Sequence, residues 1–245
     1  MTTVSLLLFL MAFLIMCTTR SKRVSSTRLL SSSSSFSGSS SSSSSSSFYD
    51  KIGRPRFISA PMVDQSSLSW RLLVRKNGAD LAFSQMIHAK NFVNDWRYRS
   101  HCIDWDNYTH TYGSEEVESE ARRLDKNQIA QFAGDDPEYL VKAGKMIQDQ
   151  VVAIDLNLGC PQKIARKGNY GAYLLPKTEL VVSLLTAMVQ ELDVPITAKL
   201  RVLPTEYATL KMVEAVEKCG VQMITLHGRT AEGKSCVEQV LRQTT

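Results

Sequence analysis

Four side chains that could bind a polar ligand or move a proton stand in or next to short apolar runs. Gln131 lies within IAQFA, Lys199 within ITAKLR, His227 ends MITLH, and Cys160 closely follows VVAIDLNL. Each has a plain structural explanation on its own, such as a hydrogen-bonded core amide or a small buried hydrophobe. Burying several polar groups without partners would cost roughly 1–3 kcal/mol each, so their joint placement favours a site filled by a polar ligand.

Cys160 stands in the motif NLGCP, between Gly159 and Pro161. These two neighbours favour a tight loop that presents the sulfur instead of burying it. A cysteine with the reference pKa of about 8.5 keeps its proton near neutrality. No thiolate-forming partner is evident nearby in the sequence, so the motif indicates a proton donor.

The chain from Phe57 onward alternates short apolar runs with segments of helical period, which is typical of βα units around a parallel sheet. We expect Ser66 to cap the first helix, Asp136-Pro137 to begin a later one, and Gly220 to end the helix over 207–219. The continuous apolar run at 151–158 predicts a strand buried on both faces. The six expected strands span 57–62, 80–84, 129–133, 151–158, 196–201 and 223–227.

Six βα units are too many for a flavodoxin-like sheet, and a complete barrel takes roughly 250 residues. The expected fold class is therefore α/β, an incomplete TIM (β/α)₈ barrel with about six of eight βα units. Its functional residues should lie at the C-terminal ends of the strands. We expect this domain over residues 51–230, followed by a divergent tail at 231–245.

Residues 1–50 have the character of a targeting leader. The apolar run VSLLLFLMAFLIMC at 4–17 precedes a basic, acid-free segment and a serine-rich tract at 31–47 that cannot bury a core. This order predicts a disordered leader for import into a plastid or mitochondrion; without leader function the protein would be cytoplasmic or nuclear. No stable membrane association is expected once the leader is removed.

Charge and cysteine usage narrow the function classes. The net charge is +5, but Arg20, Lys22, Arg23 and Arg28 precede the first acidic residue, so the body is nearly neutral and its charge gives no argument for nucleic-acid binding. The five cysteines are widely spaced without a C-x-x-C pair. This spacing predicts neither a disulfide framework nor a metal site, and it fits a reducing compartment.

The ordered motifs resemble those of the tRNA-dihydrouridine synthases, and the cysteine motif is closest to the eukaryotic branch that acts on uridines 16 and 17 of the tRNA D-loop. The resemblance covers about residues 57–230, and its most specific part is NLGCP followed by KGNYGA. It is carried by APMVDQS, the stretch from His88 to Arg99, Gln131, LNLGCPQKIARKGNYGAYL, KLRV and HGRT.

The resemblance implies an oxidoreductase that reduces the C5–C6 double bond of a uracil ring flipped out of the RNA stack. NADPH would be the reductant and FMN the cofactor, with Pro61 and Met62 against its ring system and Gln131, Lys199 and His227 bonding its polar atoms. Cys160 would supply the proton to C5. The residues that would contact the RNA substrate are Asn157 at the uracil edge, Arg201, and Lys167 on a loop with Arg166.

The sequence departs from this family after Thr230, where two further strands, the loops that grip the FMN phosphate and a helical RNA-binding domain are expected. We therefore expect weak or no FMN binding by the chain as written. Two alternatives stay open: an inactive fragment or residual RNA-binding protein, and another FMN barrel that reduces free pyrimidines. The acidic stretch at 114–127 is expected to be a solvated surface insertion.

Overall fold

The computed structural model describes residues 47–103, 123, 125 and 127–232. Most of the expected leader, most of the expected acidic insertion and the tail from 233 lie outside these described residues. Residues 48–50, which the sequence analysis assigned to the leader, lie in helix α2 (Phe48–Lys51). Phe48 is buried there against the sheet residues Leu81, Ile129 and Met223, so α2 packs where β2, β3 and β6 begin.

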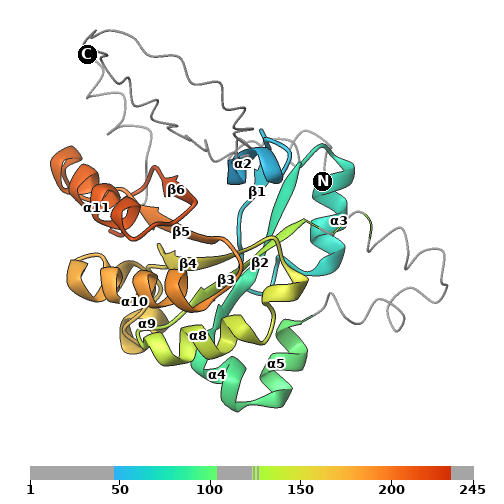
Figure 1. Ribbon diagram of the computed structural model, residues 1–245, viewed down its shortest axis with the longest axis horizontal. Coiled ribbons are helices and arrows are strands. Elements are labelled where there is room, and N and C mark those ends of the chain that lie inside the picture. The colour runs from blue at the N-terminus through green and yellow to red at the C-terminus, as the bar shows by residue number, and fades with distance from the viewer. Residues whose placement is uncertain (1–46, 104–122, 124, 126, 233–245) are drawn as a thin grey trace, which may run out of the picture.

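Six parallel strands form one sheet in the order of the sequence, and β1 and β6 are its two edges in the described part of the chain. Figure 1 shows the strands side by side with helices packed along them. This arrangement confirms the predicted incomplete (β/α)₈ barrel. The strands are β1 (Ile58–Ser59), β2 (Leu81–His88), β3 (Gln128–Ala133), β4 (Ala153–Leu158), β5 (Ile196–Arg201) and β6 (Met223–His227).

The connections between the strands are helical, as the alternating pattern predicted. Asp136 begins α8 by accepting a hydrogen bond from the amide of Glu138, and Pro137 is the first helical residue. Gly220 follows the end of α11 with a positive φ of 89°. The helices are α3 (Leu68–Lys76), α4 (Ala89–Asn94), α5 (Trp96–Cys102), α8 (Pro137–Lys145), α9 (Lys163–Lys167), α10 (Thr178–Glu191) and α11 (Glu206–Lys218), with short 3-10 turns η1 (Gln148–Gln150) and η2 (Gly171–Leu174).

The end of the first strand and the N-cap of the first long helix differ from their predictions. β1 ends at Ser59 instead of Met62, because Pro61 has no N–H for a strand ladder. Ser66 does not cap α3, for which Ser67 is the N-cap residue. The Ser66 hydroxyl instead accepts a hydrogen bond from the amide of Met62 and donates one to the carbonyl of Ala60, so it folds the loop after β1.

β2 runs four residues past its predicted end at Ser84, because a register shift between Phe83 and Met86 lets the strand continue. At the shift, the Ser84 hydroxyl accepts a hydrogen bond from the amide of Gln131 at 3.0 Å and donates one to the carbonyl of Gln85 at 2.7 Å. A side chain thus satisfies a β3 amide at the point where the ladder is interrupted.

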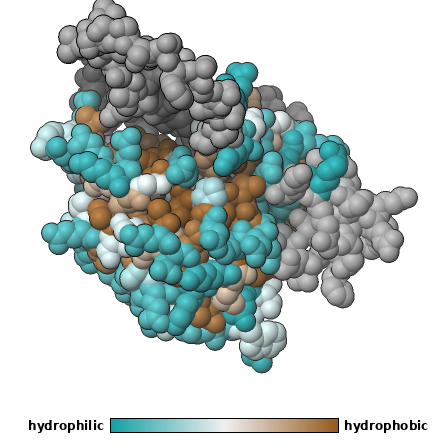
Figure 2. Space-filling view, viewed as in Figure 1, coloured by the Kyte–Doolittle hydropathy of each residue, from teal (hydrophilic) through white to brown (hydrophobic). Residues whose placement is uncertain are grey.

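The main core lies between the strands and the helices α4, α8, α10 and α11. All six residues of β4 are buried, which confirms the expectation of a strand covered on both faces. Figure 2 shows hydrophobic residues gathered over the middle of the molecule in this view, with hydrophilic residues around them. In the part of the chain that is described, no single helix is long and apolar enough to cross a membrane. One pair of helical segments, residues 163–174 and α10, is long and apolar enough only when the two are taken together, and the pair is bent by 84°.

Candidate functional site

The structure brings most of the predicted site residues to the C-terminal halves of adjacent strands or to the loops that follow them. Gln131 is in β3, Asn157 in β4 and Lys199 in β5, and Asn157 and Lys199 are register partners. Arg201 at the end of β5 is the register partner of His227 at the end of β6. Cys160 follows β4 by two residues and is partly buried. The sulfur therefore lies at the same end of the sheet as the polar side chains.

The loop that carries Cys160 is fixed by hydrogen bonds at each of its peptide groups. The Asn157 side-chain oxygen accepts from the amides of Gly159 at 3.0 Å and Cys160 at 2.9 Å. Arg201 Nε donates to the carbonyl of Gly159 at 2.5 Å, and the Tyr173 hydroxyl donates to the carbonyl of Pro161 at 3.0 Å. The Cys160 backbone is thus held in place, and its side chain packs against the buried cluster of Ala133, Ala165 and Tyr170.

Gly171 explains why the KGNYGA segment accompanies the cysteine motif. Its φ is +68°, and a Cβ at this position would lie 2.6 Å from the Cys160 carbonyl oxygen and 2.9 Å from Cys160 Cβ. The next residue, Ala172, donates its amide to that carbonyl at 3.0 Å. Only glycine combines this backbone conformation with so close an approach, so the η2 turn lies directly on the Cys160 backbone.

Gln131 and Asn157 belong to a fully buried hydrogen-bond network. Gln131 Nε2 donates to Asp155 Oδ2 at 2.8 Å, and Asn157 Nδ2 donates to Gln131 Oε1 at 2.7 Å. Thr197 Oγ1 donates to Asp155 Oδ1 at 2.6 Å. Burial raises the pKa of Asp155 to about 6, although the hydrogen bonds from Thr197 and Gln131 and the charge of Lys199 oppose the rise.

Lys199 and His227 contrast with this network, since neither side chain has a hydrogen-bond or ion-pair partner among the described residues. Burial lowers the pKa of Lys199, which the charge of Asp155 opposes and that of Arg201 reinforces. Burial also lowers the pKa of His227 to about 4, with further lowering by Lys199, Arg201 and Arg229. A neutral imidazole and a partly buried ammonium without partners form a donor set that an electron-rich polar ligand would satisfy.

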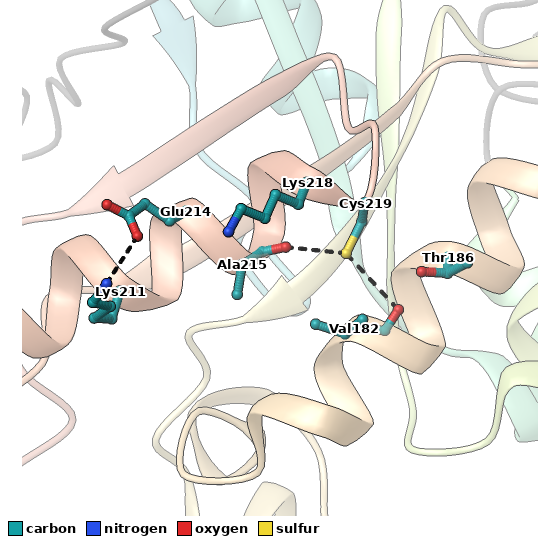
Figure 3. A pocket seen from close by; sticks show the side chains of 7 residues that line it. All are labelled: Val182, Thr186, Lys211, Glu214, Ala215, Lys218 and Cys219. Carbon is teal, nitrogen blue, oxygen red and sulfur yellow. Dashed lines mark hydrogen bonds and ion pairs between the residues drawn. The ribbon is translucent and has the colours of Figure 1, made fainter.

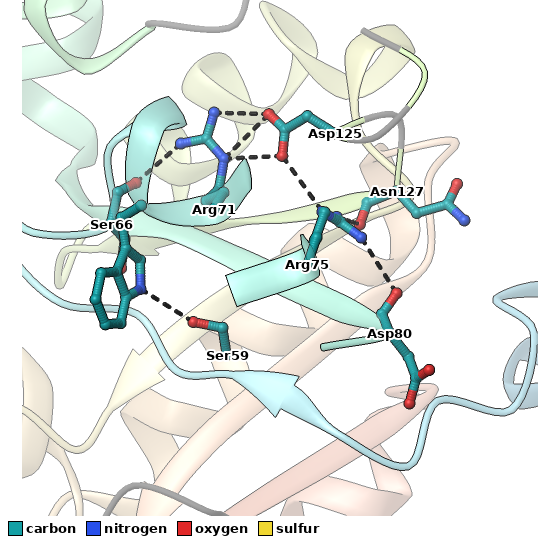
Figure 4. Close-up of polar contacts among 8 residues, drawn as sticks. Ser59, Ser66, Arg71, Arg75, Asp80, Asp125 and Asn127 are labelled. Atoms are coloured by element: carbon teal, nitrogen blue, oxygen red, sulfur yellow. Dashed lines mark hydrogen bonds and ion pairs between the residues drawn. The ribbon is translucent and has the colours of Figure 1, made fainter. Parts of the chain in front are cut away.

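Pro61 and Met62, the predicted ring-contacting residues, are partly buried in the loop between β1 and α3. A buried ion pair fixes this loop, because Arg71 donates to the Ser66 carbonyl at 2.8 Å and to Asp125 at 2.7 Å (Figure 4). Arg75 Nε lies 3.6 Å from the same carboxylate. This pair was not predicted from the sequence, since 54 positions separate Arg71 from Asp125.

The two basic residues assigned to RNA contact occupy different positions. Arg201 binds the loop of Cys160 and, through Nη1, the carbonyl of Thr230 at 3.1 Å. Lys167 is exposed at the end of α9, with Arg166 exposed beside it. The prediction that Arg166 and Lys167 stand on a loop was wrong. The helix-favouring sequence KIARK forms a short helix directly after the cysteine loop.

A groove of about 320 Å³ lies away from these strand ends, between α10 and α11. Figure 3 shows Val182, Lys211 and Cys219 among its lining residues, with Cys219 Sγ donating to the carbonyl of Ala215 at 3.2 Å. None of the predicted site residues lines it. Within the described ranges no group of three or more His, Cys, Asp or Glu side chains could hold a metal ion.

The site residues that sequence reasoning missed are Asp155, Thr197 and Tyr173. Asp155 gave a usable signal, because a carboxylate in the apolar run VVAIDLNL needs buried partners. Its partner Thr197 could be found only from the β4–β5 register, which pairs the two residues. Tyr173 gave no signal beyond its place in the GAYL stretch.

Comparisons with known proteins indicate one family over most of the described residues. The family model described as Dihydrouridine synthase (Dus) matches residues 58–240. A Saccharomyces cerevisiae protein named tRNA-dihydrouridine(16/17) synthase, with NAD(P)(+) in its name, is 43% identical over 186 residues, which are 76% of this chain and 41% of that protein. A Rattus norvegicus protein named as similar to the same enzyme is 43% identical over 75% of this chain and 39% of its own length.

Similarity extends to relatives named for other positions in tRNA. A Homo sapiens protein whose name likens it to tRNA-dihydrouridine(20a/20b) synthase is 34% identical over 71% of this chain and 51% of its own length. The identity is thus higher to the relatives named for positions 16 and 17. The chain spans about two fifths of the length of those relatives.

Proposed function

Because the chain belongs to the dihydrouridine synthase family, we propose that it reduces the C5–C6 double bond of D-loop uridines in tRNA, at positions 16 and 17. The observation that carries this proposal is the arrangement at the strand ends. Cys160 follows β4 on a loop that backbone hydrogen bonds fix, and the side chains of Lys199 in β5 and His227 in β6 have no hydrogen-bond or ion-pair partner among the described residues. The names of the relatives with the higher identity support the choice of uridine positions.

The residues present fit FMN as the cofactor. Lys199 offers three N–H donors and the neutral His227 one more, which suits the carbonyl oxygens and ring nitrogens of a flavin. Gln131 keeps one amide hydrogen and one carbonyl lone pair beyond its bonds to Asp155 and Asn157. Pro61 and Met62 would lie against the ring system. When bound, FMN reduced by NADPH supplies the hydride that adds to C6 of uracil.

Cys160 performs the other half of the reduction in this proposal. Its Sγ–H bond breaks and the proton goes to C5, so the ring gains a hydride and a proton overall and the thiolate is reprotonated from solvent. The five hydrogen bonds to the peptide groups of this loop keep the Cys160 backbone in one place while the substrate enters, which limits the entropy cost of reaching the reactive geometry. The uracil must leave the RNA stack to lie between the flavin and this sulfur.

Replacing the proton donor tests the proposal. In enzyme loaded with FMN, Cys160→Ala should leave NADPH oxidation through the flavin intact and lower dihydrouridine formation in unmodified tRNA by about a hundredfold or more. Dihydrouridine is measured by mass spectrometry of nucleosides, and tRNA with cytidine at 16 and 17 tests the positions. Cys219→Ala, in the outer groove, is the matched control and should keep wild-type turnover.

Two results would contradict the proposal. Turnover of Cys160→Ala within a few-fold of wild type would place the acid on another residue. Reduction of free uracil without reduction of tRNA would assign the chain to a barrel enzyme for free pyrimidines.

A further inference from the structure

The buried network behind Cys160 has a direction that its end groups determine. At one end stand the backbone amides of Gly159 and Cys160, which can only donate. The Asn157 carboxamide must therefore turn its oxygen toward them and its nitrogen toward Gln131. That nitrogen donates to Gln131 Oε1 at 2.7 Å, so the Gln131 nitrogen faces the next partner in turn.

The other end of the network therefore needs an acceptor, and Asp155 supplies it. Its Oδ2 accepts from Gln131 Nε2 at 2.8 Å, while its Oδ1 accepts from the Thr197 hydroxyl at 2.6 Å. Asp155 is wholly buried, so bulk solvent does not reach this acceptor position in the folded protein. A carboxylate accepts at both oxygens. The carboxamides of Gln131 and Asn157 can therefore each satisfy their partners in one orientation only, with the nitrogen directed toward Asp155 along the network.

We infer that Asp155 is a positioning residue for Cys160: as the terminal acceptor it orients the carboxamides of Gln131 and Asn157, and through them the amide side of the cysteine loop. The inference rests on the proposed function only in naming Cys160 as the proton donor. The other contacts of the loop, from Arg201, Ala172 and Tyr173, all hold carbonyl groups. Among the described residues, Asn157 alone accepts hydrogen bonds from the N–H groups of the loop. Loss of the Asp155 acceptor should therefore release the amides of Gly159 and Cys160.

Two substitutions in the 245-residue chain separate the acceptor from the bulk of the side chain. Asp155→Leu removes the acceptor, and hydrogen exchange of the Gly159 and Cys160 amides should rise about tenfold or more relative to that of Ala198 in β5. Asp155→Asn keeps an acceptor if its oxygen faces Gln131 and its nitrogen faces the Thr197 hydroxyl. Exchange in this variant should stay within about threefold of wild type.

A second pair of variants decides the matter if Asp155→Leu does not fold. Gln131→Glu alone sets two carboxylates against each other, whereas Gln131→Glu with Asp155→Asn restores a donor for every acceptor. The double variant should therefore protect the Gly159 and Cys160 amides about tenfold better than Gln131→Glu alone. The rate of Cys160 alkylation, measured by mass spectrometry with Cys219 as the internal reference, should likewise be higher in Gln131→Glu than in the double variant.

The inference is overturned if Asp155→Leu leaves both amides protected, if it raises exchange at Ala198 equally, or if the double variant is no better protected than Gln131→Glu alone. None of these measurements requires tRNA, NADPH or flavin. A chain that shows the expected exchange but reduces no tRNA would contradict the proposed function and support this inference. An active enzyme whose variants show unchanged exchange would support the proposed function and contradict this inference.

Discussion

Gly171 is the residue whose replacement should disturb Cys160 most directly. In Gly171→Ala the new methyl group would meet the Cys160 carbonyl oxygen at 2.6 Å, and the backbone would keep a φ of +68° that costs alanine about 1–2 kcal/mol. With overpacking added, we expect a loss of about 2–4 kcal/mol in the free energy of unfolding. Urea denaturation measures this loss, and the alkylation rate of Cys160 reports the displaced loop.

Gly78→Ala is the matched control, because Gly78 has a φ of +98° and nothing lies within 4 Å of the position that its new methyl group would take. It should lose only the backbone cost of about 1–2 kcal/mol and leave Cys160 alkylation unchanged. Equal losses in the two variants would mean that the η2 turn moves away from Cys160 without cost. The close approach would then have no part in positioning the sulfur.

At the scale of elements, the ion pair of Arg71 and Asp125 ties the loop after β1 to the chain entering β3. Asp125→Ala would leave two nearly buried guanidinium groups, on Arg71 and Arg75, without their carboxylate. Breaking a buried pair from one side costs about 3–5 kcal/mol. We expect that loss in urea denaturation, together with faster amide exchange at Met62, whose amide donates to Ser66.

The exposed pair of Lys145 and Glu191 provides the comparison, since both side chains are more than half exposed. Glu191→Gln should change the free energy of unfolding by less than about 1 kcal/mol. If Asp125→Ala were as mild as this control, the Arg71 contact would add nothing to the loop that carries Pro61 and Met62.

How far the sequence predicts these elements depends on whether a partner is local or distant. The bounds of β5 and β6 follow from apolar runs between polar flanks and were predicted correctly. The extension of β2 was not predictable, because the Ser84 hydroxyl bonds to Gln131 across 47 positions. The same reason hides the link from Asp155 to Thr197 and the pairing of Arg71 with Asp125. Residue types in the strands predicted which polar side chains gather at one end of the sheet, but not which other side chains they bond to.

At the scale of the whole molecule, Asp155 and His227 give the stability opposite dependences on pH. The folded pKa of Asp155 is about 6, above its unfolded value of 3.8, so its contribution is fully present below pH 3.8 and lost as pH rises through 6. The folded pKa of His227 is about 4, below its unfolded value of 6.5. Its contribution is present above pH 6.5 and lost as pH falls through 4. The two contributions therefore offset each other in wild type between about pH 4 and 6.

Single substitutions should reveal each contribution separately. Relative to wild type, Asp155→Asn should become less stable as pH falls from about 6 to 4, by up to roughly 3 kcal/mol. His227→Gln should instead become more stable relative to wild type over the same range, because it no longer carries a histidine that gains its proton on unfolding. Urea denaturation at several pH values from about 4 to 7 gives both differences. Parallel pH curves for the three proteins would show that neither the burial of Asp155 in β4 nor the half-burial of His227 at the end of β6 shifts its pKa as far as stated above.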